Sequence, residues 1–426
     1  MSNPTTPFSW QMPTATDLVT DLPADFEVFG QAVATSMADL LGGTSGQILA
    51  KNSNTDMDFT WIANDQGDIT GVTAGTGILV TSPTGPVPTV TFDQANYGGG
   101  QFSAGKNRII NSDFGIWARG TTFTSPASGA YTADRYATVQ NGTGTSTISQ
   151  QSFALGTAPV TGYEGTYFLR HLVTAVGTST VNGIEQRIES VRTFANQTVT
   201  FSFWAKADTA RTISARIDQY FGTGGSPSAT VTGTVYTFSA TTAWTRFSQT
   251  ITLASIAGKT IGTSGTDALY FKIYNANTLN SQMDIWGVTV EAGSFATPFQ
   301  TASGGSQEGE LAMCQRYYQR QFPNAVTAGL GAGFADGTTA ALIKIPLKVT
   351  MRIAPTALEQ SGTAADYGAR IAGGTTVACN AVPTFFGATA DEAYASFPFA
   401  SGLTAGQGLF GRAAGTAAYL GWSAEL

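Results

Sequence analysis

Acid–base and nucleophilic groups are scarce in this chain of 426 residues. His171 is the single histidine, so any Ser-His-Asp triad would have to include it. Residues 167–172 around it have the pattern of a strand, which favours a structural role. Glu185 and Glu189 could form a carboxylate pair of the glycosidase type, but two acids four residues apart are more often solvated surface. We therefore expect no catalytic residue and no enzymatic activity.

Metal, cofactor and phosphate sites are not indicated by the sequence either. No group of Cys and His residues has the spacing of a zinc site, and Cys314 and Cys379 are too few for a disulfide framework. The Gly-rich residues 329–333 lack the Gly-Lys-Ser/Thr ending of a phosphate-binding loop. A structural calcium ion remains a possibility, although no segment has the dense Asp/Asn pattern of an EF-hand loop. We expect no cofactor and no metal ligand.

Aromatic rings are the remaining candidates for a binding site, because sugars stack their apolar faces on exposed rings and polar side chains fix their hydroxyls. Trp204, Trp244 and Trp286 lie in strong strand patterns, where packing in a core is the more usual use. Tyr367 and Tyr394 lie in polar, turn-rich surroundings, so we expect both to be exposed. The candidates for sugar binding are Trp117, Arg119, Tyr131, Tyr367, Arg370 and Tyr394.

The composition indicates a folded protein built from short strands. Hydrophobic residues make up 42% of the chain, which argues against disorder, and the 50 glycines suit many turns. Charged residues make up only 12%, the net charge is −7, and no Lys/Arg cluster is dense enough to follow a phosphate backbone. We expect a mainly β protein of two or three folded parts that does not bind nucleic acid.

Targeting signals are not evident. Residues 1–10 have neither the basic nor the apolar region of a signal peptide, and no apolar run approaches the roughly 20 residues of a membrane helix. We expect synthesis in a cytoplasm without a signal peptide, no membrane insertion, and an exit other than secretion, such as release in a virion by lysis.

Residues 21–43 contain the clearest helix signal. Asp21 is a candidate N-cap, Pro23 is tolerated in the first turn, and Gly42 and Gly43 would end the helix. Such a short helix is marginal alone, and a parallel bundle with copies of itself would bury its stripe; the pattern does not distinguish a dimer from a trimer. The stripe that would form this seam consists of Phe26, Phe29, Val33, Met37 and Leu40.

The segments on either side of this helix are sparse in apolar residues. Residues 1–20 read as an extended arm, which could dock on a larger assembly or be a frayed terminus. Residues 44–105 read as a hairpin over residues 46–63, then a Gly/Thr-rich neck with a linker at residues 98–100. The neck has too few apolar residues for a core of its own, so we expect it to pack with partner chains in a parallel homotrimer.

Two β regions follow. Residues 106–303 contain many strands with period-two alternation and no intervening helix, which predicts a β-sandwich. Residues 304–426 begin with a short helix or helical turn over residues 307–321 and then return to a β pattern with Gly/Ala/Thr loops that carry aromatic residues.

Three groups of segments resemble proteins of tailed bacteriophages. The virion-proximal end of phage minor tail proteins is resembled by residues 17–26 (DLVTDLPADF), 46–49 (GQIL) and 58–61 (DFTW). The carbohydrate-binding-module-like jelly roll of phage tail fibres is resembled by residues 107–111 (NRIIN), 132–136 (TADRY) and 201–207 (FSFWAKA). The jelly-roll exit and fibre tip are resembled by residues 290–294 (VEAGS), 296–299 (ATPF), 310–318 (ELAMCQRYY), 351–356 (MRIAPT) and 423–426 (SAEL).

The resemblance implies an elongated homotrimer with its N-terminus on phage tail or baseplate proteins, a jelly roll, and a C-terminal β tip that faces the host. It also implies recognition of a host-surface glycan or the cell envelope. We place recognition in the tip, residues 322–426, because it would be farthest from the virion, with the jelly roll as support or a weaker second site. The tip rings could instead pack between chains. A purely structural tail or head fibre and a polysaccharide depolymerase are the alternative functions.

Overall fold

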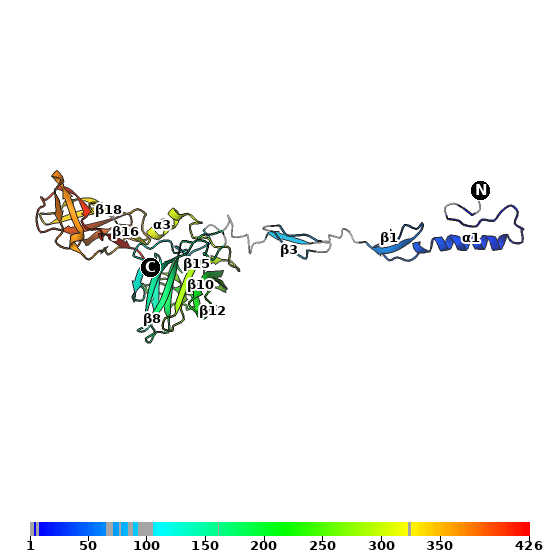
Figure 1. The fold of residues 1–426 in the computed structure, drawn as a ribbon, viewed down its shortest axis with the longest axis horizontal. Coiled ribbons are helices and arrows are strands. Elements are labelled where there is room, and N and C mark those ends of the chain that lie inside the picture. Colours follow the sequence, from blue (N-terminus) through cyan, green and yellow to red (C-terminus); the bar gives the residue numbers. More distant parts are fainter. Residues whose placement is uncertain are drawn as a thin grey trace. The chain divides into compact units, whose positions relative to one another are not determined.

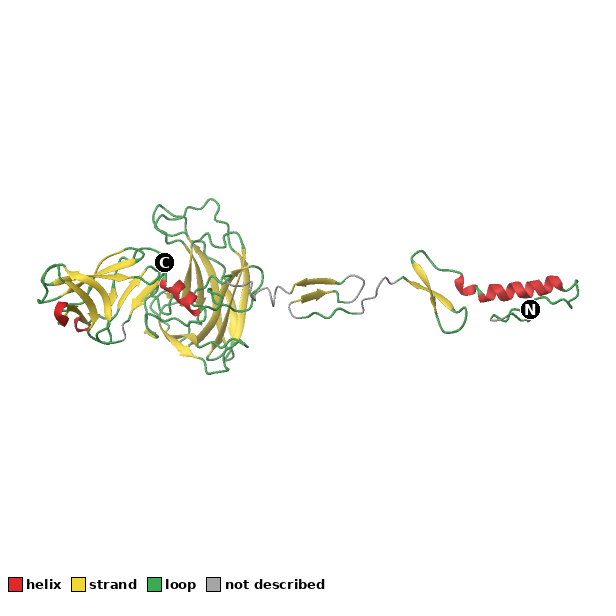
Figure 2. Ribbon diagram, turned by 90° about the horizontal axis from the view of Figure 1, so that it is seen from above, coloured by secondary structure: helices red, strands yellow, loops and turns green. Residues whose placement is uncertain are grey.

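The computed structural model describes residues 4–5, 8–64, 71–75, 78–83, 88–92, 105–160, 162–322 and 325–426. The linker expected at residues 98–100 lies outside these ranges. The chain divides into two compact units, Met1–Asp93 and Gln94–Leu426. Strands are the main regular structure of the described residues (Figures 1 and 2). Within those residues no helix is long and apolar enough to cross a membrane.

Helix α1 of the first unit spans Leu22–Ser36 and is followed by the short 3₁₀ helix η1, Ala38–Leu40. Asp21 precedes the helix as expected, but its side chain makes no capping hydrogen bond. No residue of α1 is buried, and Phe26 of the predicted seam is 57% exposed. The apolar stripe therefore lacks a full partner within one chain, which leaves the predicted bundle untested.

The arm that precedes α1 is not fully extended. The Trp10 ring lies 6.1 Å from that of Phe29, and its Nε1 donates to Ser36 Oγ at 3.0 Å. Phe8 stacks on Trp10 with 4.9 Å between ring centroids. Residues 8–10 therefore pack along the helix, because these aromatic rings cover part of the stripe that α1 otherwise leaves exposed.

The predicted hairpin at residues 46–63 is confirmed. Strands β1 (Gln47–Lys51) and β2 (Phe59–Ala63) pair antiparallel with Leu49 opposite Trp61. Strands β3 (Ile78–Thr81) and β4 (Thr89–Phe92) form a second two-stranded sheet in the neck. Both sheets are too small to bury a core of their own.

Residues from about 122 to 292 form a sandwich of two antiparallel sheets, as predicted. The first sheet has the order β13 (Thr245–Thr252), β10 (Thr198–Ala207), β15 (Gln282–Ala292), β8 (Tyr167–Ala175), β7 (Thr145–Ser152), β5 (Thr122–Thr124). The second sheet has the order β12 (Tyr236–Ala240), β11 (Arg211–Tyr220), β14 (Ala268–Tyr274), β9 (Asn182–Glu189), β6 (Tyr136–Gln140). Between them lies one continuous core that includes Phe201, Phe203, Phe271 and Ile285.

The C-terminal region begins with helix α3, Gln307–Gln315, which the Ser306 side chain caps by accepting from Gly309 N. The helix is shorter than the predicted residues 307–321, because Tyr318–Gln321 pairs with the last strand and becomes β16. A three-stranded sheet has the order β16, β25 (Leu420–Ser423), β19 (Glu359–Gln360).

A seven-stranded antiparallel sheet forms most of the rest of the C-terminal region. Its order is β21 (Thr376–Ala378), β20 (Tyr367–Ile371), β24 (Gly408–Ala413), β17 (Gly329–Ala335), β18 (Ala340–Pro346), β23 (Glu392–Pro398), β22 (Thr384–Ala388). Short 3₁₀ turns, η3 (Ala364–Asp366) and η4 (Ala372–Gly374), flank β20. A second core under this sheet includes Ile343, Phe397 and Trp422. This region and the sandwich belong to the same compact unit.

Candidate functional site

The three C-terminal candidates lie in different environments. Tyr367 is 0% exposed, and its hydroxyl donates to Tyr419 O at 2.7 Å and accepts from Ser361 N at 2.8 Å. The expectation that Tyr367 is exposed is therefore wrong, because the pleat of β20 turns this side chain to the core. Arg370 is exposed on the same strand, and Tyr394 is half-buried on β23, where its hydroxyl donates to Glu392 at 2.6 Å.

The candidates Trp117, Arg119 and Tyr131 lie elsewhere, in the sandwich. Trp117 Nε1 donates to Phe114 O at 2.7 Å, and the ring packs against the sandwich core. Arg119 lies 3.4 Å from Glu425 Oε1 and 3.9 Å from Asp134 Oδ1. The Tyr131 hydroxyl donates to Leu426 O at 3.1 Å. The polar atoms of Arg119 and Tyr131 thus hold the C-terminal segment.

The two groups considered for catalysis have structural partners. His171 is fully buried, and its ring nitrogens contact the amides of Asn182 and Asn275 at 3.1 and 3.2 Å. Burial lowers the pKa of His171 to about 4. Glu185 is bound by Arg187, whereas Glu189 lies at the end of β9 beside Arg316.

The outer face of the five-stranded sheet carries a row of tyrosines. In β11 and β14, side chains such as Ile217 and Phe271 point into the core, so the alternate residues point outward. Tyr220 and Tyr270 are half-buried on this outer face, with 5.1 Å between ring centroids. Tyr274 lies on the same side of β14 and is 7% exposed. The rings offer flat apolar surface with a hydroxyl at one edge.

A charge network crosses the same face from β9 to β11. Lys272 Nζ lies 3.0 Å from Asp218 Oδ2 and 3.6 Å from Glu185 Oε2. Arg187 binds Glu185 at 2.8 Å, and Arg216 Nε lies 3.0 Å from Asp218 Oδ1. These paired charges present fixed donors and acceptors beside the rings.

Burial also affects the Tyr270 hydroxyl on this outer face. It raises the pKa of Tyr270 to about 12, despite the opposing effect of Arg187, whose guanidinium lies 4.9 Å from the ring. The phenol is therefore neutral near pH 7 and can both donate and accept a hydrogen bond. Rings flanked by fixed donors and acceptors suit a ligand that has apolar faces and hydroxyl edges, as a saccharide does.

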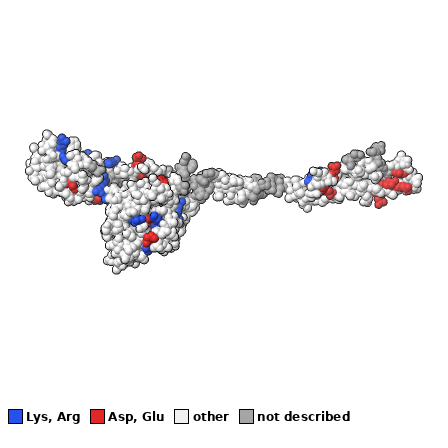
Figure 3. All heavy atoms as spheres, in the orientation of Figure 1, with Lys and Arg blue, Asp and Glu red and all other residues white. Residues whose placement is uncertain are grey.

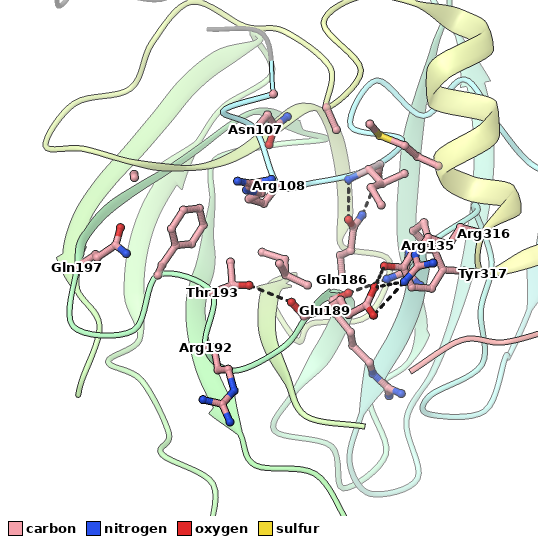
Figure 4. Close-up of a pocket in the computed structure, with 18 residues that line it drawn as sticks. Asn107, Arg108, Arg135, Gln186, Glu189, Arg192, Thr193, Gln197, Arg316 and Tyr317 are labelled. Carbon is pink, nitrogen blue, oxygen red and sulfur yellow. Dashed lines mark hydrogen bonds and ion pairs between the residues drawn. The ribbon is translucent and has the colours of Figure 1, made fainter. Parts of the chain in front are cut away.

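A cavity of about 770 Å³ lies at the end of β9 (Figure 4). Its walls come from β9, the loop at residues 190–197, the segment at residues 105–110, and the end of α3. Figure 4 shows Arg135, Arg316 and Tyr317 gathered beside that helix. Arg187 and Glu189 also line the cavity, so it adjoins the outer face of the five-stranded sheet.

The outer face of the other sheet is closed by aromatic packing. Trp286 is 0% exposed and Trp204 is 8% exposed; they pack with each other and with Phe299, and Trp286 also contacts Tyr163. The prediction that these two tryptophans pack in a core is confirmed. Trp244 at the edge of this cluster is half-buried.

Charged side chains are sparse on the surface that Figure 3 shows, where most of the atoms belong to uncharged residues. Among the described residues, no group of three or more His, Cys, Asp or Glu side chains is placed to hold a metal ion. Both Cys314 and Cys379 are free and buried.

Tyr220, Tyr270, Lys272 and Asp218 were not selected from the sequence as candidates for sugar binding, and Glu185 was considered only for catalysis. The alternation of residues 269–274 predicted a strand there, and the polar and aromatic positions of that alternation were the available signal. What the sequence did not show is that β9, β14 and β11, far apart along the chain, pair side by side.

Comparison with known protein families finds a match in the sandwich. Residues 135–263 match a family model described as "Carbohydrate binding domain". This range includes Tyr220 and most of the charge network, while Tyr270 and Lys272 follow directly after it. The chain thus contains a β-sandwich region of carbohydrate-binding type. No curated protein sequence matches the chain.

Several solved structures are similar over part of the chain. The enzymatically active domain of bacteriophage CBA120 tailspike protein 4 matches with a TM-score of 0.28 and 12% identity, over 44% of this chain and 21% of that chain. A CBM4 structure matches with a TM-score of 0.23 and 19% identity, over 34% and 87% of the two chains. The CBM22-1 xylan-binding domain of Paenibacillus barcinonensis Xyn10C matches with a TM-score of 0.26 and 9% identity, over 45% and 98%. All three TM-scores are below 0.5.

Proposed function

We propose that this protein is a tail fibre or minor tail protein of a tailed bacteriophage that recognises a host-surface glycan through the outer face of its five-stranded sheet. The observation that carries the proposal is that the carbohydrate-binding match covers four of the five strands of this sheet, β6, β9, β11 and β12. Their outer face bears Tyr220 and most of the charge network, and the neighbouring β14 adds Tyr270 and Lys272. We therefore place recognition in the sandwich rather than in the C-terminal region, where Tyr367 is buried.

The phage assignment rests on the sequence resemblance of short segments within residues 17–61, 107–207 and 290–318. In this proposal the N-terminal arm and α1 attach the protein to tail or baseplate proteins, and the C-terminal region is the fibre tip. The exposed stripe of α1 and of Met37 after it supports self-association, since Phe26 and Met37 are 57% and 45% exposed in one chain. A parallel homotrimer is what the phage resemblance implies. Three copies would add avidity to a weak sugar contact.

In this proposal the protein has no enzymatic activity and acts in the virion without a cofactor. The partners of the candidate catalytic groups support this, because His171 is surrounded by amides and Glu185 is bound by Arg187 and Lys272. A purely structural fibre is the alternative, and it differs from the proposal only in having no glycan ligand.

Binding of the full-length protein to purified surface polysaccharides from a panel of bacterial strains tests the proposal. We expect retention by the polysaccharide of one or a few strains in affinity electrophoresis, with no release of reducing ends. Failure to bind any polysaccharide from a strain to which the protein adsorbs would favour a different receptor. Release of reducing ends, lost in Glu185→Gln, would instead show a depolymerase.

A further inference from the structure

The cavity at the end of β9 has an unusual concentration of arginines for a chain with so few charges. Its volume of about 770 Å³ lies within the range of small-molecule sites. The residues Phe194 and Tyr317, 8% and 4% exposed, give it an apolar lining. The arginines that line it are Arg108, Arg135, Arg187, Arg192 and Arg316.

Three of these arginines have carboxylate partners. Arg135 pairs with Glu425, Arg187 with Glu185 at 2.8 Å, and Arg316 with Glu189 at 3.2 Å. Arg108 and Arg192 have no carboxylate partner among the described residues. They place two unpaired positive charges at the cavity of a protein whose net charge is −7.

The donors of these two arginines are available to a ligand. Arg108 and Arg192 are both exposed, and in the described part of the chain neither side chain makes a hydrogen bond or ion pair. Arg135, which lies beside Arg316 and Tyr317 in Figure 4, is 1% exposed, and its buried Nε has no acceptor among the described residues. Guanidinium groups bind carboxylates and phosphates by paired hydrogen bonds, which neutral sugars cannot match in strength.

We propose that this cavity binds the anionic group, a carboxylate or a phosphate, of an acidic saccharide. Arg187 lies both on the outer face of the sheet and in the wall of the cavity, so one glycan chain could occupy both places. That the ligand is a saccharide rests on the proposed function. That the cavity takes an anion rests on its own arginines.

The test compares glucuronic acid and glucose 6-phosphate with neutral glucose as ligands of the full-length protein, by ligand-observed NMR or calorimetry. We expect one or both acidic sugars to bind more tightly than glucose, and the stronger of the two identifies the anionic group. The double variant Arg108→Gln/Arg192→Gln should weaken acidic-sugar binding at least about tenfold and leave glucose unaffected. The charge-matched control Lys259→Gln/Lys348→Gln removes two exposed lysines outside the cavity and should leave both unchanged.

Two outcomes overturn the proposal. The first is that neither acidic sugar binds better than glucose. The second is that the arginine variant retains the full affinity for the acidic sugar. Tyr220→Ala/Tyr270→Ala is measured alongside, because loss of polysaccharide binding only in that variant would uphold the outer face while refuting the cavity. Loss of the acidic preference only in the arginine variant supports the cavity independently of the outer face.

Discussion

The imidazole of His171 is held in one neutral tautomer by two amides. Asn275 Nδ2 donates to His171 Nδ1 at 3.2 Å and also to Ser281 O at 2.9 Å, which fixes the orientation of that amide. Nε2 must then donate to Asn182 Oδ1 at 3.1 Å. A proton on Nδ1 would point at a donor in a fully buried site, which adds to the effect of burial in keeping the ring neutral.

The stability of the second unit should therefore depend on His171 below neutral pH. The folded pKa of about 4 is below the ordinary 6.5, so the unfolded state takes up the proton first as the pH falls. The contribution of neutral His171 to the free energy of unfolding is fully present above about pH 6.5. It is lost between about pH 6.5 and pH 4, and the total loss is about 3 kcal/mol. Thermal unfolding of wild type and His171→Gln from pH 7 to 4 measures this difference.

The pH dependence, not the absolute stability, is the deciding quantity. Burial raises the pKa of Asp134 to about 6 and also raises that of Glu310, which gives a slope of opposite sign. Wild type and His171→Gln both contain these two carboxyl groups, so their effect on the pH dependence cancels when the two are compared. Equal pH dependence in wild type and variant would contradict the proposed role of His171.

Glu425 joins the C-terminal segment to the sandwich. It binds Arg135, which is 1% exposed, and lies 3.4 Å from Arg119. Glu425→Ala would leave the buried Arg135 charge without its carboxylate, at a cost of about 3–5 kcal/mol. We expect calorimetry to show a fall of several degrees in the unfolding temperature of this unit. Glu392→Ala, which breaks the exposed pair with Lys344, is the control, and an equal effect of both changes would argue against a buried junction.

At the scale of elements, α1 has an apolar stripe in its sequence, but no residue of α1 is buried within one chain. Phe26→Asp together with Val33→Asp should weaken self-association, because each places a charge in the predicted seam. Gln31→Asp with Thr35→Asp puts the same charges on the opposite, exposed face and should have little effect. Sedimentation velocity across a range of concentrations measures both, and unchanged association of the seam variant would show that α1 does not hold the chains together.

The local sequence pattern predicted the helices and strands better than it predicted the residues of the candidate binding site. The period-two alternation of residues 269–274 and the stripe of residues 26–40 depend on neighbours in sequence, so the strand and the start of the helix were correctly predicted. The predicted end of the helix at Gly42 and Gly43 was wrong, because α1 ends at Ser36 and only a short 3₁₀ helix follows. The turn-rich surroundings of Tyr367 suggested exposure, but strand pairing decided its burial. The network of Glu185, Lys272 and Asp218 joins three strands, and no local pattern carries their pairing.

At the scale of the whole molecule, the proposal requires a trimer. The stripe of α1 and the two-stranded sheets of the neck cannot bury a core within one chain, so partner chains should complete them. Light scattering of the intact protein should give three times the chain mass of 44.2 kDa. A monomer mass would contradict both the trimer and the avidity argument, while a dimer mass would preserve the seam but not the fibre geometry.

The central claim is that the outer face of the five-stranded sheet binds the glycan. The affinity of the full-length protein for its polysaccharide, compared between two double variants, tests it most directly. Tyr220→Ala/Tyr270→Ala removes the paired rings of that face, and Phe386→Ala/Phe410→Ala removes two rings, 62% and 60% exposed, from the C-terminal sheet. We predict a loss of at least about tenfold for the tyrosine variant and less than about twofold for the phenylalanine variant. Unchanged affinity of the tyrosine variant, with loss in the phenylalanine variant, would contradict the claim and place recognition in the C-terminal region.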